Sequence, residues 1–186
     1  MTVIHSDYGD SDTKALSAMW EGLEEVRVIT ITDLAIPNTR DDIREALESE
    51  EDTLILTGHG SPSGLLARDT SSFLSISYAF TKDDIPFVKA KNIIGVWCYA
   101  SDFSKNNSLR GFYSSMFISS GLEAALIGIG GVSDDEIKAS EILFCHRINA
   151  LLGDNVPLSG WTEKLRAFHL TNSVEEFNYS KLYYRE

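Results

Sequence analysis

The chain has 186 residues, 43% of them hydrophobic, and a formal net charge of −12. This length and apolar content predict a folded single domain over residues 1–186, with a core of useful size. The negative charge argues against nucleic-acid and anionic-membrane partners, which need clustered Lys and Arg side chains, and it either favours a cationic peptide or only keeps the surface soluble.

Short apolar runs alternate with helical patterns along the chain. The runs are apolar on both faces and rich in β-branched residues, which predicts interior strands of a parallel sheet at residues 2–5, 26–32, 53–58, 92–100 and 124–131. Helical spacing predicts helices from residues 11–12 to about 23, at 39–49, 107–121 and 133–153, and at roughly 157–168. Cap residues support them, namely Ser11 or Asp12, Asn38 and Ser133 at N-termini and Gly121 and Gly153 at C-termini. The fold class expected is α/β, a doubly wound, mainly parallel sheet with helices on both faces.

Two of the predicted strands end in residues with reactive side chains, a histidine and a cysteine. "LILTGHGSPS" (54–63) ends in His59, and "NIIGVWCYAS" (92–101) ends in Cys98. Ligands of open parallel sheets bind beyond the carboxyl ends of the strands, so both side chains are expected at one rim if the strands are neighbours. An imidazole that takes the proton of a nearby thiol produces a nucleophilic thiolate.

The glycines around His59 fit the same interpretation. Gly58 and Gly60 would let the backbone turn sharply and approach a substrate closely. The N–H groups of Gly60 and Cys98 are the candidate donors to the oxyanion that forms during acyl transfer. The irregular stretch 61–78 follows directly, and long loops inside compact domains are often functional.

The order of these residues, His-Gly after one apolar strand and Cys after a later one, resembles the caspase-like cysteine peptidases. The continuation "GFYSSMFISSGLEAALIGIGGVSDDEIKASEILF" resembles the CHAT family among them, and the resemblance covers about residues 50–167. It departs from the family at Trp97, where Ala or Ser is usual, and lacks the Ser-Gly or Thr-Gly that often follows the cysteine. The resemblance implies a caspase-like three-layer sandwich in which His59 is the general base and Cys98 the nucleophile.

Acidic residues follow several of the predicted strands. Asp7 and Asp10 come after the first strand, and Asp102 and Asp134 after later ones. In caspase-like folds the end of the first strand helps to form the pocket for the residue before the scissile bond, and caspases place an arginine there. Carboxylates would instead select Arg or Lys. The alternative is that Asp12 caps a helix and the others solvate a loop.

The sequence therefore predicts a cysteine endopeptidase that acts on a peptide or protein substrate, with cleavage expected after basic residues. Two alternatives stay open: a catalytically silent caspase-like module that binds a protein partner, and a glutamine-amidotransferase-like hydrolase, whose G-x-C-x-G elbow is missing. Even for an active enzyme, a regulatory protein partner could be required.

No cofactor or metal is expected, because zinc-ligand spacing and nucleotide-binding motifs are missing. Cys98 and Cys145 are too few for a disulfide framework, which favours a reducing compartment. The first residues lack the pattern of a signal peptide, and no apolar run approaches the roughly 20 residues of a membrane helix. We therefore expect a cytoplasmic protein.

Overall fold

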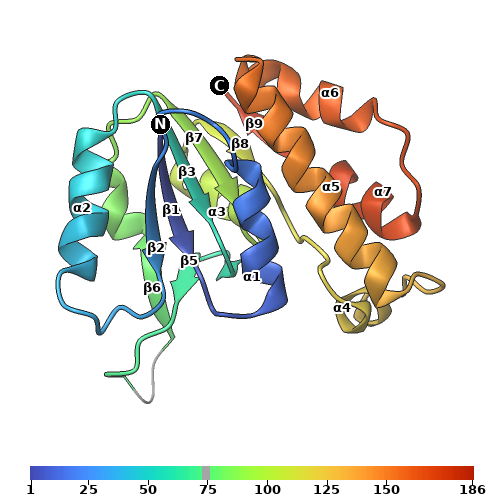
Figure 1. The fold of residues 1–186 in the computed structure, drawn as a ribbon, viewed down its shortest axis with the longest axis horizontal. Coiled ribbons are helices and arrows are strands. Elements are labelled where there is room, and N and C mark those ends of the chain that lie inside the picture. The colour runs from blue at the N-terminus through green and yellow to red at the C-terminus, as the bar shows by residue number, and fades with distance from the viewer. Residues whose placement is uncertain (73–75) are drawn as a thin grey trace.

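A mainly parallel sheet forms the centre of an α/β fold (Figure 1). The computed structural model describes residues 1–72 and 76–186, and within these ranges the sheet has six strands in the order β2-β1-β3-β7-β8-β9. Their bounds are β1 (Thr2–Ser6), β2 (Arg27–Ile31), β3 (Thr53–Thr57), β7 (Asn92–Val96), β8 (Gly111–Tyr113) and β9 (Tyr183–Arg185). Only β9 runs antiparallel to its neighbour among these strands. The carboxyl ends of β3 and β7 therefore lie at the same edge.

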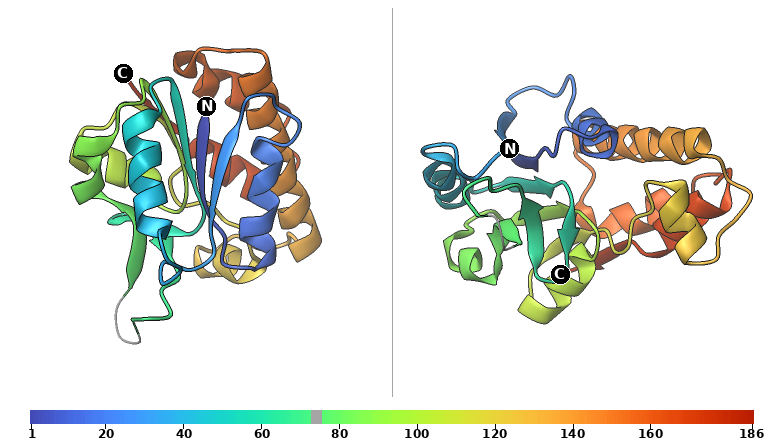
Figure 2. Two further views of the ribbon diagram at one scale, coloured as in Figure 1. Left: turned by 60° about the vertical axis from the view of Figure 1, so that its left-hand side comes forward. Right: turned by 90° about the horizontal axis from the view of Figure 1, so that it is seen from below.

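Helices cover both faces of the sheet (Figure 2). Side chains of β3 alternate between the faces: Leu54 and Leu56 pack with α2 and α3, while Ile55 packs with η1, α5, α6 and α7. The helices are α1 (Ser11–Ala15), α2 (Thr39–Ser49), α3 (Ala100–Asn107), α4 (Gly121–Leu126), α5 (Asp134–Gly153), α6 (Trp161–Arg166) and α7 (Ser173–Ser180). Short 3-10 helices are η1 (Leu16–Met19), η2 (Lys82–Phe87) and η3 (Leu158–Gly160).

A small antiparallel sheet follows His59 where an irregular stretch was expected. Its strands are β4 (Gly60–Ser61), β5 (Gly64–Ala67) and β6 (Ser77–Thr81). Residues 73–75 of the expected loop lie outside the described residues. The new sheet fixes the backbone on the carboxyl side of His59, because the Leu66 N–H donates to the His59 carbonyl at 2.9 Å.

The helix predictions at 39–49 and 133–153 are confirmed by α2 and α5. Ser133 caps α5 and forms a capping box with Glu136. The first predicted helix is wrong in length and in its cap: α1 and η1 end at Met19, and the carboxylate of Asp10 caps α1. The predicted helix at 157–168 is observed as η3 followed by α6.

Two neighbouring predictions, a helix at 107–121 and a strand at 124–131, are wrong. The first range contains β8, where buried Phe112 pairs with Ile94 of β7. Gly111 has φ of +131° and lies against the Ile93 carbonyl, so it belongs to a close strand contact. The second range contains the end of α4, which leaves Leu122 and Leu126 exposed. The predicted strand 92–100 also ends early, at Val96.

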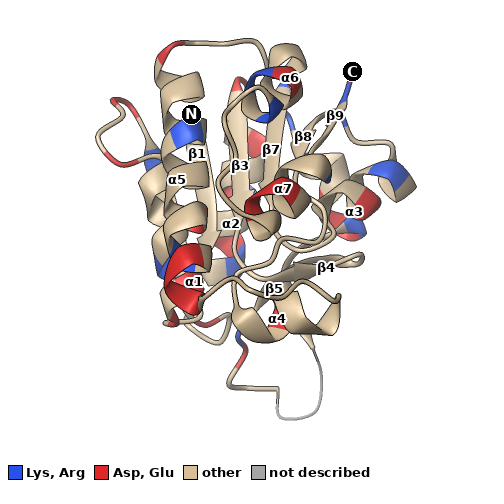
Figure 3. Ribbon diagram, turned by 90° about the vertical axis from the view of Figure 1, so that its right-hand side faces the viewer, with Lys and Arg blue, Asp and Glu red and all other residues tan. Residues whose placement is uncertain are grey.

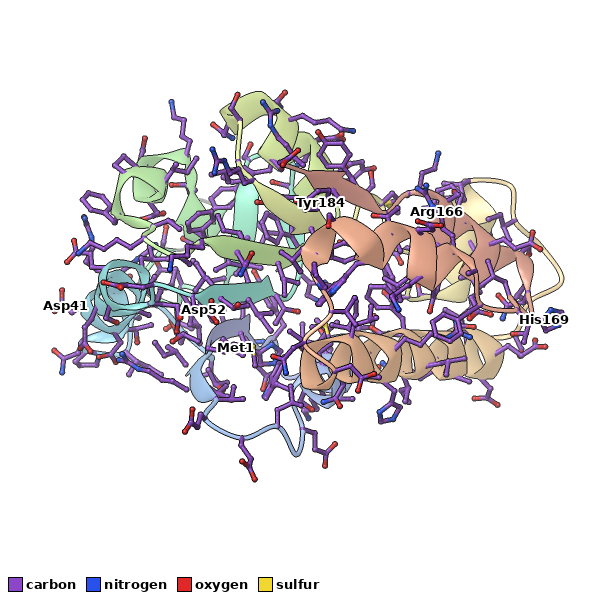
Figure 4. All side chains as sticks on the ribbon, turned by 90° about the horizontal axis from the view of Figure 1, so that it is seen from above. Met1, Asp41, Asp52, Arg166, His169 and Tyr184 are labelled. Carbon is purple, nitrogen blue, oxygen red and sulfur yellow. The ribbon has the colours of Figure 1, made fainter. Side chains whose placement is uncertain are left out.

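The end of the sheet at which the parallel strands begin is seen in Figure 4. Met1 and Asp52, next to the starts of β1 and β3, lie side by side there, with Asp41 of α2 and His169 at opposite sides of the molecule. In the described ranges, no helix is both long and apolar enough to cross a membrane. The candidate site lies at the other end of the strands.

Candidate active site

His59 and Cys98 line one pocket beyond the carboxyl ends of two neighbouring strands. β3 and β7 are parallel and adjacent, with Thr57 opposite Val96, and each strand is followed two residues later by one of the two side chains. The view from this end is the right-hand panel of Figure 2. The pocket is small, about 30 Å³, so it admits water but no large side chain without opening.

Both glycines beside His59 are required by their surroundings. Gly58 has φ of +144°, and a Cβ there would approach the Ser6 carbonyl to 2.6 Å. A Cβ on Gly60 would overlap the indole ring of Trp97. Strand β3 therefore ends at this point because its chain must turn against β1 and then pass over an indole ring, which only glycine permits.

Trp97 holds the turn in place from the core side. Its side chain is 2% exposed, packs edge-on against Phe103 of α3 and donates from Nε1 to the Ser61 carbonyl at 3.3 Å. Cys98 instead borders the core on the opposite face of the sheet. The large residue before the cysteine is thus a structural support for the His-Gly turn.

The imidazole of His59 is held by two residues of the loop between β1 and α1. Its Nε2 lies 2.8 Å from Oδ2 of Asp10, and its ring makes an edge-on contact with Tyr8 at 5.1 Å between centroids. Partial burial acts to raise the pKa of Asp10, but hydrogen bonds from the Thr13 N–H, from His59 and from the Thr13 hydroxyl lower it to about 2. Asp10 is therefore an ionised partner of the histidine near neutral pH.

The thiol of Cys98 is protonated and partly shielded. Its Sγ donates to the Phe117 carbonyl at 3.4 Å, and burial together with the nearby Glu123 carboxylate raises its pKa. Tyr99, the next residue, has φ of +68°, a backbone conformation that is uncommon for a bulky side chain. This sharp turn carries the chain from β7 into α3 and leaves Cys98 at the rim.

The two backbone N–H groups expected as oxyanion donors are unused by the described part of the chain. No hydrogen bond from the Cys98 N–H to a described residue is present, whereas the Tyr99 N–H donates to the Ser115 carbonyl. The Leu66 N–H donates to His59, which makes Gly60 and Leu65 a non-hydrogen-bonded pair of the small sheet. The Gly60 N–H therefore faces away from β5.

The wall of the pocket beside Cys98 is acidic. Asp12 and Glu141 line it, and Lys138 bridges them with its Nζ 3.4 Å from Asp12 and 2.7 Å from Glu141. Glu141 is 3% exposed, and this burial is the main reason why its pKa is raised to about 7. Repulsion from Asp12 and Asp10 also raises the pKa, and the nearby Lys138 offsets only part of the increase. Figure 3 shows acidic residues on α1 and α4 at this end of the sheet.

The four carboxylates expected at the rim have different positions. Asp10 reaches His59, as described above, and Asp7 accepts from the Gly9 N–H in the same loop, with its Oδ1 3.2 Å from the Thr13 hydroxyl of α1. Asp102 pairs with Lys105 on α3, and Asp134 accepts from the Gly121 N–H at the start of α4. None of the four is among the described residues that line the pocket.

Sequence reasoning missed the contribution of α5 to the pocket. Glu141 occupies the helical spacing of the buried residues Ile137, Phe144 and Ile148, a rare place for a carboxylate. That charged residue within an apolar stripe was the available signal. No group of three or more His, Cys, Asp or Glu side chains in residues 1–72 and 76–186 could hold a metal ion.

Comparison with known proteins gives no family for this chain. No protein-family model matches it, and no curated protein is significantly similar to it. The functional assignment therefore depends on the residues of the pocket.

Proposed function

We propose that this protein is a cysteine endopeptidase with a caspase-like, doubly wound three-layer fold, in which Cys98 is the nucleophile and His59 the general base. The observation that carries the proposal is that both side chains line one pocket at the carboxyl ends of adjacent parallel strands. The central parallel strands with helices on both faces support the fold assignment. Such strand ends are where open α/β sheets bind ligands.

The chemistry begins with transfer of the Cys98 proton to His59. The thiolate then attacks the carbonyl carbon of the scissile peptide bond, and the electron pair of the C=O bond moves to the oxygen. The free N–H groups of Gly60 and Cys98 would stabilise that oxyanion. The protonated imidazole gives its proton to the leaving amine, and water hydrolyses the acyl-enzyme.

The resting contact of Cys98 with Phe117 is part of this account. Because burial and Glu123 raise the pKa of the thiol, Cys98 stays protonated until the proton can pass to His59. The small pocket must also open to admit a peptide. We infer that substrate binding displaces the thiol from the Phe117 carbonyl, at 3.4 Å in this structure.

We further propose that the substrate carries Arg or Lys before the scissile bond. Asp12 and Glu141 line the pocket wall and are opposed by the single ammonium group of Lys138. A second cation would stabilise the ionised form of Glu141, whose pKa is raised to about 7 chiefly by burial. An acidic side chain would add repulsion to the same wall.

Peptide hydrolysis tests the proposal. Matched fluorogenic peptides ending in Arg, Lys, Asp and Leu should be cleaved with a preference of about 10- to 100-fold for the basic residues, as one charge-assisted hydrogen bond would give. Cys98→Ala should abolish cleavage, and Cys145→Ala, a change in the buried thiol on α5, should not. Cleavage that survives Cys98→Ala would overturn the peptidase assignment, and a preference for Asp or Leu would overturn the specificity.

A second candidate function is a binding module that uses the same pocket without chemistry. The observation in its favour is the partly buried, protonated Cys98 thiol, which donates to a backbone carbonyl. Such a module would bind a basic peptide without cleaving it. For both candidate functions we propose a cytoplasmic location, where the two free cysteines would stay reduced.

A further inference from the structure

Asp10 connects the candidate base to a helix. Its Oδ1 accepts from the Thr13 N–H at 2.8 Å and from the Thr13 hydroxyl at 2.9 Å, which caps the N-terminus of α1. Its Oδ2 lies 2.8 Å from Nε2 of His59. The cap fixes the carboxylate, and one oxygen remains for the imidazole.

The protonation state of this pair follows from the donor inventory. With a pKa of about 2, Asp10 is a carboxylate that can only accept hydrogen bonds at neutral pH. Nε2 of His59 must therefore carry the proton of the neutral ring, and Nδ1 carries the lone pair. No described residue hydrogen-bonds to Nδ1, so this nitrogen is free to accept a proton.

We propose that Asp10 is a positioning residue that holds His59 in its Nε2-protonated tautomer and so makes Nδ1 the base for Cys98. The inference rests on the proposed function. In the step that it supports, the S–H bond of Cys98 breaks and an Nδ1–H bond forms, which gives a thiolate and an imidazolium without any further reactant. The Asp10 carboxylate then stabilises the imidazolium through the hydrogen bond that is already present.

The edge-on contact of Tyr8 with the imidazole supports the same role. The ring planes meet at 79°, and the Tyr8 carbonyl is itself held by Arg68 at 2.9 Å. The imidazole is thus fixed by a hydrogen bond and by a ring contact, both from the loop that joins β1 and α1. Asp10 is consequently occupied and is not available to bind a substrate cation.

The Asp10→Asn variant removes the negative charge of residue 10 and keeps a side chain that can cap α1. Asn is as good an N-cap as Asp, so α1 should keep its start, but the amide can donate as well as accept and no longer dictates the tautomer. Asp7→Asn is the matched control, because Asp7 lies in the same loop with its Oδ1 3.2 Å from the same Thr13 hydroxyl, and no hydrogen bond joins it to His59. Asp10→Ser keeps a cap while being too short to reach the ring.

Two readouts test the proposal. Long-range ¹⁵N–¹H spectra of the neutral imidazole should show a protonated Nε2 in the wild type and in Asp7→Asn, and a mixture of tautomers in Asp10→Asn and Asp10→Ser. In peptide hydrolysis, kcat should fall about 10- to 100-fold in the two Asp10 variants with little change in KM. This loss is smaller than the roughly 10²- to 10⁴-fold rate contribution of a general base, because His59 itself is still present. The pH dependence of Cys98 alkylation should change in the same two variants.

The two readouts also separate this inference from the peptidase assignment. If the protein cleaves no peptide but shows the expected tautomers, the positioning role of Asp10 stands and the peptidase assignment fails. A wild-type ring protonated at Nδ1 would overturn the inference, whatever the activity. The same holds if the Asp10 variants match Asp7→Asn in tautomer and in pH profile.

Discussion

Trp97 and Gly60 are in direct contact, and the indole ring fills the space that a side chain on residue 60 would need. The contact links the segment that follows β7 and carries Cys98 to the turn that carries His59. Trp97 also donates from Nε1 to the Ser61 carbonyl, so two interactions hold this turn. A large residue before the cysteine is therefore compatible with the site, because it packs toward the core with Phe103.

Gly60→Ala should destabilise the protein by about 1–3 kcal/mol, as overpacking of a tight core contact does. The physical reason is that Trp97 is 2% exposed and the methyl group would displace its ring. Chemical denaturation measures the effect. Gly160→Ala is the control, since no atom lies within 4 Å of a Cβ there and the backbone has φ of −91°. Equal stabilities of the two variants would refute the role given to Trp97.

Glu123→Gln should speed the alkylation of Cys98 by iodoacetamide near pH 7. Burial is the main cause of the raised pKa of this thiol, and the Glu123 carboxylate adds to it. Removing the charge should increase the rate by about two- to fivefold, less than the tenfold of a full pKa unit. A glutamine oxygen can still accept from the Ser119 N–H, as the carboxylate does at 2.8 Å.

The control for that experiment is Glu136→Gln, which removes the same charge from the capping box at the start of α5. It should leave the alkylation rate of Cys98 unchanged. If both variants react at the wild-type rate, Glu123 does not restrain the thiol. The rate is followed by mass spectrometry of the peptide that contains Cys98.

Glu141→Gln should change how stability depends on pH. The folded-state pKa of Glu141 is about 7, raised from an ordinary 4.5 mainly by burial, and Asp12, Asp10 and Lys138 face the same group. Protonation therefore favours the folded state. This contribution to stability is fully present below pH 4.5 and is lost as the pH rises through about 7. The difference between the two pKa values corresponds to about 3 kcal/mol.

Denaturation at pH 5, 6, 7 and 8 tests this sign. The unfolding free energy of the variant, relative to the wild type, should increase with pH toward that value. Glu136→Gln should not reproduce the increase, because hydrogen bonds from Ser133 lower the pKa of Glu136. A difference that stays constant over this pH range would contradict a raised pKa for the buried Glu141 carboxyl.

The strands that carry the site could be predicted because their signal is local. Leu54 to Leu56 and Ile93 to Ile94 are buried apolar runs, and the rule that ligands bind at strand ends brings His59 and Cys98 together. The predictions for residues 107–131 were wrong because the structure there depends on contacts that are distant in the sequence. Phe112 becomes a strand residue only through its pairing with β7, a contact made across the sheet that periodicity does not report.

The acidic residues show the same limit within the site. Asp10 follows the first strand as expected, but its bonds to Thr13 and His59 depend on how the loop after β1 folds toward the turn that follows β3. Glu141 lies on a helix that was predicted with its cap and its end, and only the packing of α5 against the sheet brings this residue beside Cys98. The position of α5 was thus accessible from local patterns, and the partners of individual carboxylates were not.

The most direct test of a catalytic Cys98–His59 pair is covalent labelling by a peptidyl chloromethyl ketone that ends in Arg. The account predicts modification of Cys98 and not of Cys145, whose thiol is fully buried and whose pKa is raised by that burial. His59→Ala should slow the labelling of Cys98 selectively, as followed by mass spectrometry of the digested protein. Labelling that is equal at the two cysteines, or unaffected by His59→Ala, would contradict the account.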